Sequence, residues 1–204
     1  LLITIPTVLF YLTDFADLPV GERALASLFQ AVTPRTAGYN TVDLTKMSDT
    51  SQAVTILLML TGGAPGSTAG GMKVTTLAVL IANAIAAFHR REDSRLFDRR
   101  LDYSAVRNAA TILLLYLSLT FVGAAVISKV EGLPLGACLY ETASAAGTVG
   151  LTLGLTPQLG TLSQSILILL MFFGRVGGLT LIYAAFSGHD LTYARYPKEM
   201  ITVG

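Results

Sequence analysis

Long apolar stretches alternate with short polar ones along this chain, and their lengths predict helices embedded in a membrane. Residues 1–12 are apolar but fall short of the roughly 20 residues that cross a bilayer, so we expect the end of a spanning helix there. The stretches 105–130 and 162–186 are each long and apolar enough to span. Residues 21–33 and 133–146 predict two short helices, each ahead of a long apolar stretch. The pattern therefore predicts an all-α membrane protein.

One apolar stretch is too long to be a single spanning helix. Residues 50–88 would form a helix of about 58 Å, roughly twice the hydrocarbon thickness of a bilayer. Residues 62–71, the glycine-rich loop, contain five glycines and one proline and predict an interruption between two half-helices. Irregular backbone at membrane depth is tolerated only where protein or a water-filled cavity satisfies its polar groups. The alternative is a kinked helix that packs closely on a neighbour.

Two parts of the chain match at a constant offset of 112 residues. The first turn, residues 36–39 (TAGY), aligns with the second turn, residues 148–151 (TVGL). Rings of backbone carbonyls replace the hydration shell of potassium in known selectivity filters, and glycine allows the backbone conformation that this needs. Each turn follows a predicted short helix and precedes a long apolar one, which is the layout of an ion-channel pore loop. A pair of ordinary loop turns is the alternative.

The composition agrees with a membrane protein. The chain is 52% hydrophobic and only 13% charged, against about a quarter in soluble domains, and its mean hydropathy is +0.63. The net charge is +1 and the basic residues form no extended stripe, so no nucleic-acid partner is expected. Catalysis is not expected either, because His89 and His189 lie at the edges of the apolar stretches and no aspartate lies within them.

Charge also predicts the orientation. Residues 90–104 form a short basic loop, and the positive-inside rule places such loops in the cytoplasm. The polar tail, residues 189–204, carries Arg195 and Lys198 and is expected on the same side. With the basic loop inside, both turns enter the membrane from the outer face.

Four motifs in this order resemble one transporter family. They are Arg35–Asn40, Gly62–Thr75, Glu141–Leu151 and Met171–Thr180, and they resemble the membrane subunit of Trk/Ktr potassium transporters, in the superfamily that includes the plant high-affinity potassium transporters. The resemblance implies helix–pore loop–helix units around a pseudo-fourfold cation pore, four in one chain. This chain resembles the third unit (1–89) and the fourth (105–188). Since it starts inside an apolar run, we expect it to be the C-terminal half of a longer protein.

The resemblance also implies functional residues. The transported ion is potassium and no other cofactor is implied. The filter residues would be Thr36, Ala37, Gly38, Tyr39, Thr148, Val149, Gly150 and Leu151. The gate beneath them would be Gly62, Gly63, Pro65, Gly66, Ser67, Thr68, Gly70, Gly71, Lys73 and Arg175.

Four charged residues near these motifs have open interpretations. A charge within a membrane helix is costly and usually faces a cavity or a partner. The resemblance implies that Arg175 contacts the gate, and a purely structural role is the alternative. Lys73 either snorkels toward the cytoplasm or caps carbonyls of the broken helix. Arg35 is expected to brace the first turn from behind, and Glu141 to brace the second short helix through buried hydrogen bonds.

The resemblance further implies a bacterial plasma-membrane protein that works with partners. These are a second copy of the subunit in a homodimer, a cytosolic ring of nucleotide-binding regulatory proteins, and membrane lipid. A sodium-permeable or non-selective cation transporter is an alternative, and a non-conducting membrane scaffold is another.

Overall fold

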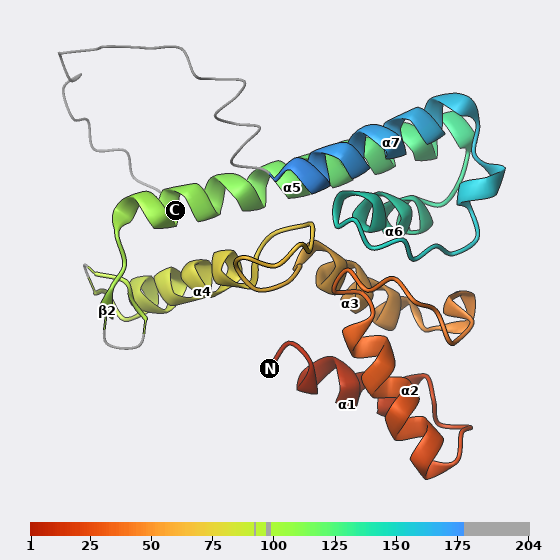
Figure 1. Cartoon of the computed structure of the whole chain (residues 1–204), viewed down its shortest axis with the longest axis horizontal. Helices are drawn as coiled ribbons and strands as arrows, with labels where there is room; N and C mark the ends of the chain where they lie inside the picture. The colour runs from red at the N-terminus through yellow and green to blue at the C-terminus, as the bar shows by residue number, and fades with distance from the viewer. Residues whose placement is uncertain (92, 97–98, 178–204) are drawn as a thin grey trace.

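The computed structural model describes residues 1–91, 93–96 and 99–177, and within them the chain is mostly helical (Figure 1). The elements are α1 (Thr4–Thr13), α2 (Val20–Val32), η1 (Leu44–Lys46), α3 (Asp49–Leu60), α4 (Val74–Phe88), β1 (Arg95–Leu96), β2 (Arg99–Arg100), α5 (Tyr103–Glu131), α6 (Leu135–Ala146), η2 (Thr156–Gln158) and α7 (Thr161–Val176).

The predicted helix order is confirmed. The two short helices are α2 and α6, and each begins directly after a proline, Pro19 or Pro134, whose ring cannot donate a backbone hydrogen bond. The long apolar stretch is two half-helices, α3 and α4, separated by the glycine-rich loop. The basic loop contains a small antiparallel hairpin, β1–β2, which the sequence pattern did not predict.

Two predicted helix boundaries need correction. Helix α5 begins at Tyr103 rather than at residue 105, since Asp102 adopts extended backbone and its carboxylate accepts a hydrogen bond from the Ser104 hydroxyl. The helix predicted over 162–186 begins at Thr161, and helix α7 ends at Val176 because Gly177 adopts a positive φ of 90°. The remaining residues of that prediction, 178–186, lie outside the described part of the chain.

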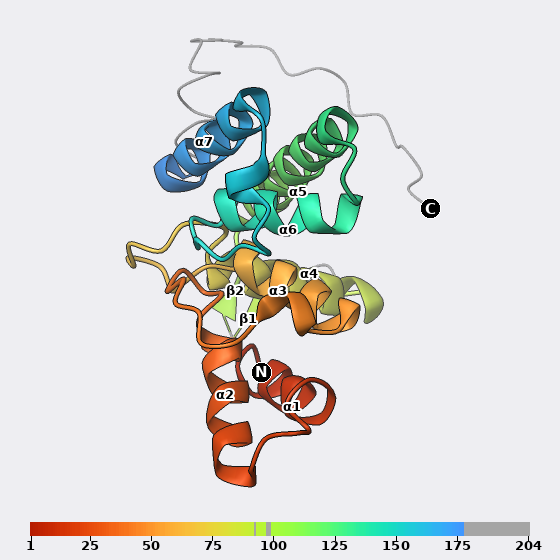
Figure 2. The same cartoon turned by 90° about the vertical axis from the view of Figure 1, so that its right-hand side faces the viewer.

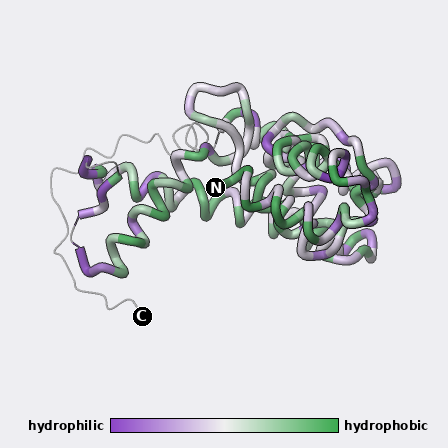
Figure 3. Tube along the Cα trace, turned by 90° about the horizontal axis from the view of Figure 1, so that it is seen from below, coloured by the Kyte–Doolittle hydropathy of each residue, from purple (hydrophilic) through white to green (hydrophobic). Residues whose placement is uncertain are grey.

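The helices form two consecutive units that share an interface (Figures 1 and 2). In the first unit α1 packs on α2 and α3; in the second, α5 packs on α6 and α7. Helix α6 also contacts α3, and α4 runs against α5, so the units meet along both halves of the broken helix. Figure 3 shows hydrophobic helix bodies, with hydrophilic segments at the end of the molecule that carries the basic loop and also at the opposite end.

Among the described residues, α5 is the one helix long and apolar enough to cross a membrane; α1, α3, α4 and α7 are apolar but shorter. Large apolar side chains on α5 point outward, including Leu114 (68% exposed), Phe121 (57%) and Val122 (63%). Such a surface is typical of a helix that faces lipid rather than water.

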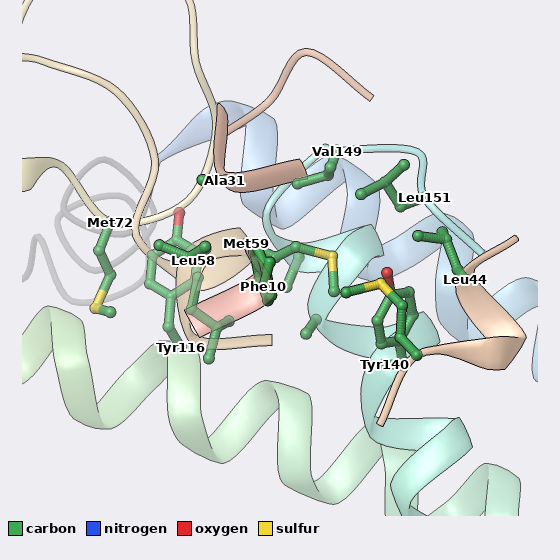
Figure 4. Close-up of a cluster of buried hydrophobic side chains, with 14 of the residues drawn as sticks. Phe10, Ala31, Leu44, Leu58, Met59, Met72, Tyr116, Tyr140, Val149 and Leu151 are labelled. Atoms are coloured by element: carbon green, nitrogen blue, oxygen red, sulfur yellow. The ribbon is translucent and has the colours of Figure 1, made fainter. Parts of the chain in front are cut away.

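One buried cluster joins the two units (Figure 4). Phe10 of α1 and Met59 of α3 belong to it together with Tyr116 of α5 and Tyr140 of α6. Val149, from the second turn, is also a member. The turn is therefore anchored in the same core that holds the helices together.

In the first unit a carboxylate ties α1 to α3. Asp14, which follows α1, accepts a hydrogen bond from the Ser48 backbone N–H (2.7 Å) and others from the hydroxyls of Ser51 and Thr13. Burial raises the pKa of Asp14, but these hydrogen bonds outweigh burial and hold the pKa below its ordinary value of 3.8. Ser48 in turn caps the N-terminus of α3.

The second unit repeats this clasp with different residues. Glu131, at the end of α5, accepts hydrogen bonds from the Gly160 backbone N–H (2.9 Å) and the Ser163 hydroxyl (2.6 Å). Gly160 and Ser163 lie 112 residues after the two serines that bind Asp14. In both units, therefore, an acid from the first helix caps the start of the helix that follows the turn.

Candidate ion pathway

The two Thr-x-Gly turns have the same unusual backbone. Thr36 and Thr148 adopt positive φ values of 69° and 54°, and Gly38 and Gly150 follow at 74° and 93°. A positive φ is disfavoured for a β-branched residue, so surrounding contacts must hold both threonines in place. The repeat seen in the sequence is therefore also a repeat in backbone conformation.

Hydrogen bonds from the end of each short helix hold these turns. In the first turn, the N–H groups of Ala37 and Gly38 both donate to the Thr33 carbonyl, and the Thr33 hydroxyl donates to the Tyr39 carbonyl (2.5 Å). In the second, Ser144 accepts from Val149 N–H at its carbonyl and from Gly150 N–H at its hydroxyl (3.1 Å). A hydroxyl-bearing residue near the helix end thus organises each turn.

The two turns lie in direct contact. A Cβ atom at Gly38 would lie 2.0 Å from the Val149 carbonyl oxygen, so only glycine fits at this position. The last residues of the two turns differ in environment, because Tyr39 is 73% exposed whereas Leu151 is 2% exposed. The structure therefore brings the Thr-x-Gly cores together and leaves the Tyr39 side chain outside the packed region.

Glu141 braces the second turn through the segment that follows it. One carboxylate oxygen accepts from the Thr152 hydroxyl (2.6 Å) and Leu153 N–H (2.9 Å), and the other accepts from the Thr156 hydroxyl (2.6 Å). The buried brace predicted for Glu141 is thus present. Gln30 of α2, which lies 111 rather than 112 residues before Glu141, is also buried, but among the described residues its amide has no hydrogen-bond partner.

The two ends of the glycine-rich loop, where α3 ends and α4 begins, lie side by side. Gly62 N–H donates to the Met72 carbonyl (2.7 Å), and Met72 N–H donates to the Leu60 carbonyl (3.0 Å). Val74 N–H closes the loop further by donating to the Gly63 carbonyl (3.1 Å). The interruption is therefore a loop whose two ends, residues 60–63 and 72–74, are hydrogen-bonded to each other, and not a bend in a continuous helix. These paired ends are the neck of the loop.

This loop packs directly against the second turn. A Cβ atom at Gly70 would lie 2.1 Å from Thr148 Oγ1 and 2.9 Å from the Gly147 carbonyl oxygen. Helix α7 closes in from another direction, since a Cβ atom at Gly174 would meet the Ala146 carbonyl oxygen at 2.0 Å. Pro65 and Gly66, in contrast, are exposed at the loop tip.

Three cationic side chains donate hydrogen bonds to carbonyls of this loop. Arg175 of α7 reaches across to the Thr68 carbonyl (2.5 Å). Lys73 donates to the carbonyls of Ser67 (3.1 Å) and Ala69 (2.5 Å), so it caps carbonyls of the loop rather than extending away from it. Charged donors make stronger hydrogen bonds than neutral ones, and backbone carbonyls outside a helix need such partners in a low-dielectric environment.

The third cation is Arg35, and its contact differs from the predicted one. Its Nη2 donates to the Gly62 carbonyl (3.1 Å), at the neck of the glycine-rich loop, and not to the first turn. Sequence reasoning could not find this contact because 27 residues separate the partners.

A cavity of about 640 Å³ opens beside the second turn. Its lining includes Glu141, Thr148, Gly150 and Arg175, so the second turn and the α7 arginine face the same space. The cavity therefore joins the second turn to the cation that contacts the loop.

The chain has two units of helix, short helix, turn and helix, and the last helix of the first unit is broken into α3 and α4. This arrangement defines a helical membrane transporter of the pore-loop kind. Residues 1–190 match the family described as "TrkH: Cation transport protein", and the chain belongs to that family. It is a family of transporters rather than of enzymes, which agrees with the prediction from the sequence.

Two similar curated proteins are bacterial uptake proteins. The chain is 37% identical over 187 residues to the Ktr system potassium uptake protein B of Bacillus subtilis (strain 168), covering 92% of this chain and 42% of that protein. It is 39% identical over 189 residues to the potassium/sodium uptake protein NtpJ of Enterococcus hirae, covering 90% of this chain and 42% of that protein. The chain thus spans less than half the length of these relatives.

The fold is also that of a solved transporter. The crystal structure of the potassium transporter TrkH from Vibrio parahaemolyticus matches with a TM-score of 0.73 over 90% of this chain and 42% of that chain, at 20% sequence identity. At this identity the likeness concerns the fold, and it supports the assignment of repeated helix–pore loop–helix units.

Proposed function

We propose that this chain forms half of a pore through which potassium ions are taken up across a bacterial plasma membrane. In this proposal the two turns, Thr36–Tyr39 and Thr148–Leu151, contribute backbone carbonyls to the selectivity filter. The third unit of the pore is residues 1–89 and the fourth is 105–188, with two further units supplied by the rest of the protein. The chain matches 42% of the length of each of two relatives, which supports the proposal that the rest of a longer protein supplies the other two units.

The glycine-rich loop is proposed as the gate of this pore. Gly70 packs on Thr148, so the loop occupies the space next to the second turn, where an ion that leaves the filter must pass. Arg175 places a positive charge on the same loop through Thr68. A cation near the path of a cation raises an electrostatic barrier, which movement of the loop and its arginine would lower.

The observation that carries the proposal is the contact of the first turn with the second, where Gly38 lies against the Val149 carbonyl. Two unrelated loop turns are not expected to share a positive-φ pattern and also to pack on each other. Two turns of one filter are expected to do both, because each ion binds carbonyls from several turns at once.

Sodium transport is the second candidate, favoured by the 39% identity to a protein named for both potassium and sodium uptake. The first turn contains Ala37 where the second contains Val149, so the filter core is not uniform. A mixed ring of this kind is compatible with either ion.

The partners are also proposals. The basic loop 90–104 and the tail 189–204 would face the cytoplasm and meet a ring of nucleotide-binding regulatory proteins, and a second copy of the subunit would complete a homodimer. The described part of the basic loop presents exposed arginines, including Arg95 and Arg99, that suit an acidic partner surface.

Uptake by the complete protein in lipid vesicles tests the proposal. Rubidium uptake driven by a potassium gradient is expected, and it should be inhibited by external potassium more strongly than by sodium. Equal inhibition by the two ions would favour the sodium-permeable alternative. Vesicles with correctly folded protein but no flux of either ion would contradict a conducting function.

A further inference from the structure

The offset that aligns the two turns also pairs arginines with glycines. Arg35 of the first unit aligns with Gly147 of the second, and Arg175 of the second unit aligns with Gly63 of the first. At each of these two aligned positions, therefore, one unit has an arginine and the other has a glycine. Both arginines donate hydrogen bonds to the same loop, Arg35 to its neck and Arg175 near its tip.

The glycine at the first of these positions has a steric reason. A Cβ atom at Gly147 would lie 2.3 Å from the Met59 carbonyl oxygen and 3.0 Å from that of Ala143. Any side chain there would push the end of α3 away from α6. An arginine can therefore occupy this register only in the first unit, where Arg35 turns toward the neck of the loop.

The neck is a point where movement of the loop can be controlled. Gly62 uses both of its main-chain groups there, since its N–H donates to Met72 and its carbonyl accepts from Arg35. A Cβ atom at Gly62 would lie 2.0 Å from the Gly70 carbonyl oxygen, so the two ends of the loop are in contact. Arg35 directly precedes Thr36, whose positive φ starts the first turn.

We propose that Arg35 is a positioning residue that couples the first turn to the neck of the glycine-rich loop. Its guanidinium holds the Gly62 carbonyl, so a shift of the first turn moves the neck, and opening of the loop has to break or carry this contact. Arg175 restrains the loop near its tip from the other unit. Arginines of both units thus restrain the loop, and its release requires the hydrogen bonds of Arg35 and Arg175 both to break.

This inference deepens the proposed function, on which its meaning for ion flow rests, but the contact itself is testable without flux. Cys138 is the single cysteine and is fully buried, so a Cys138→Ala background leaves an introduced thiol as the only reporter. Met72 is buried (5% exposed) at the neck of the loop, so Met72→Cys would react with a water-soluble maleimide only when the neck opens.

In the complete protein carrying this reporter, Arg35→Gln should raise the rate of maleimide labelling about tenfold, since hydrogen bonds from charged donors contribute enough to shift an equilibrium by that factor. Basal rubidium flux should rise in parallel. Arg35→Lys keeps a charged donor and should raise both rates by a smaller factor. Arg23→Gln is the matched control: Arg23 lies on α2, the short helix that precedes Arg35, but donates to the Tyr11 carbonyl, so labelling should not change.

Several outcomes would overturn the proposal. Unchanged labelling in both Arg35 variants would mean that the contact does not restrain the loop. A changed potassium-to-sodium ratio with unchanged labelling would assign Arg35 to the filter instead. If Arg35→Gln does not fold, Arg35→Lys decides by the same readings. Labelling that rises as expected in a protein without any flux would preserve the coupling and contradict the proposed function alone.

Discussion

Replacement of Gly70 by alanine is the sharpest test of the contact between the glycine-rich loop and the second turn. The φ of Gly70 is not positive, so alanine adds no backbone strain there, and the new methyl group is a purely steric probe. It would lie 2.1 Å from Thr148 Oγ1, and one side must retreat by about 1.3 Å to restore an ordinary contact. Overpacking of this kind costs about 1–3 kcal/mol.

If the packed arrangement is the closed one, that cost falls on the closed state alone. The ratio of open to closed protein should then rise roughly 5- to 150-fold, and basal rubidium flux into vesicles should rise with it. Thermal unfolding of the purified protein, followed in the same detergent, separates this effect from general loss of fold. Flux that is unchanged in a well-folded Gly70→Ala protein would refute the gating interpretation of the contact.

Gly63→Ala is the matched control for this variant. Its methyl group would meet Ser67 Oγ at 2.6 Å and Ala69 Cβ at 2.9 Å, so its clashes lie within the loop and not across to the turn. The exposed Ser67 side chain can rotate away at little cost. A flux increase as large as that of Gly70→Ala would show that the loop responds to any internal disturbance, and the contact with Thr148 would lose its special role.

Three further predictions concern the filter and the braces. Gly38→Ser should lower the preference for potassium over sodium in competitive uptake assays, because its side chain displaces the Val149 carbonyl; full retention of preference would contradict a filter role. Glu141→Ala should lower the free energy of unfolding by at least about 2 kcal/mol, since three donors lose a charged acceptor, and an unshifted melting temperature would disprove the brace. The pKa of Asp14 is lowered from 3.8, so its clasp is fully present above about pH 4 and is lost as the pH falls through the lowered pKa. Acidification below about pH 4 should therefore lower the melting temperature more in the parent protein than in Asp14→Asn. Parallel pH profiles of the two proteins would exclude a contribution from this carboxylate.

Features that depend on local composition could be predicted from the sequence. The density of glycine in residues 62–71 indicated a break in the apolar stretch, and the structure has helix ends on both sides of it. Length and polarity located α2, α5 and α6 within about two residues, the usual uncertainty of helix ends. Apolar composition did not predict the end of α7 before Gly177, because composition does not show where a single glycine leaves the helical conformation.

Features that depend on tertiary proximity could not be predicted. The clasp of Asp14 with Ser51 joins residues 37 apart, and a serine near a helix start has no local sign of a distant acid. Positive φ at Thr36 and Thr148 runs against the preference of β-branched residues, so local propensity pointed the other way. The roles of the turns as a filter and of the loop as a gate stay predictions until flux is measured.

The interruption between α3 and α4 has a consequence for how the protein reaches its membrane. These helices have 12 and 15 residues, each below the roughly 20 that partition stably into lipid alone, and the loop between them exposes peptide groups that hydrocarbon cannot solvate. Neither half can therefore leave the insertion machinery as an independent segment. Since α4 packs on α5 and α3 on α6, we expect this part of the nascent chain to enter the bilayer only together with the later-synthesised helices.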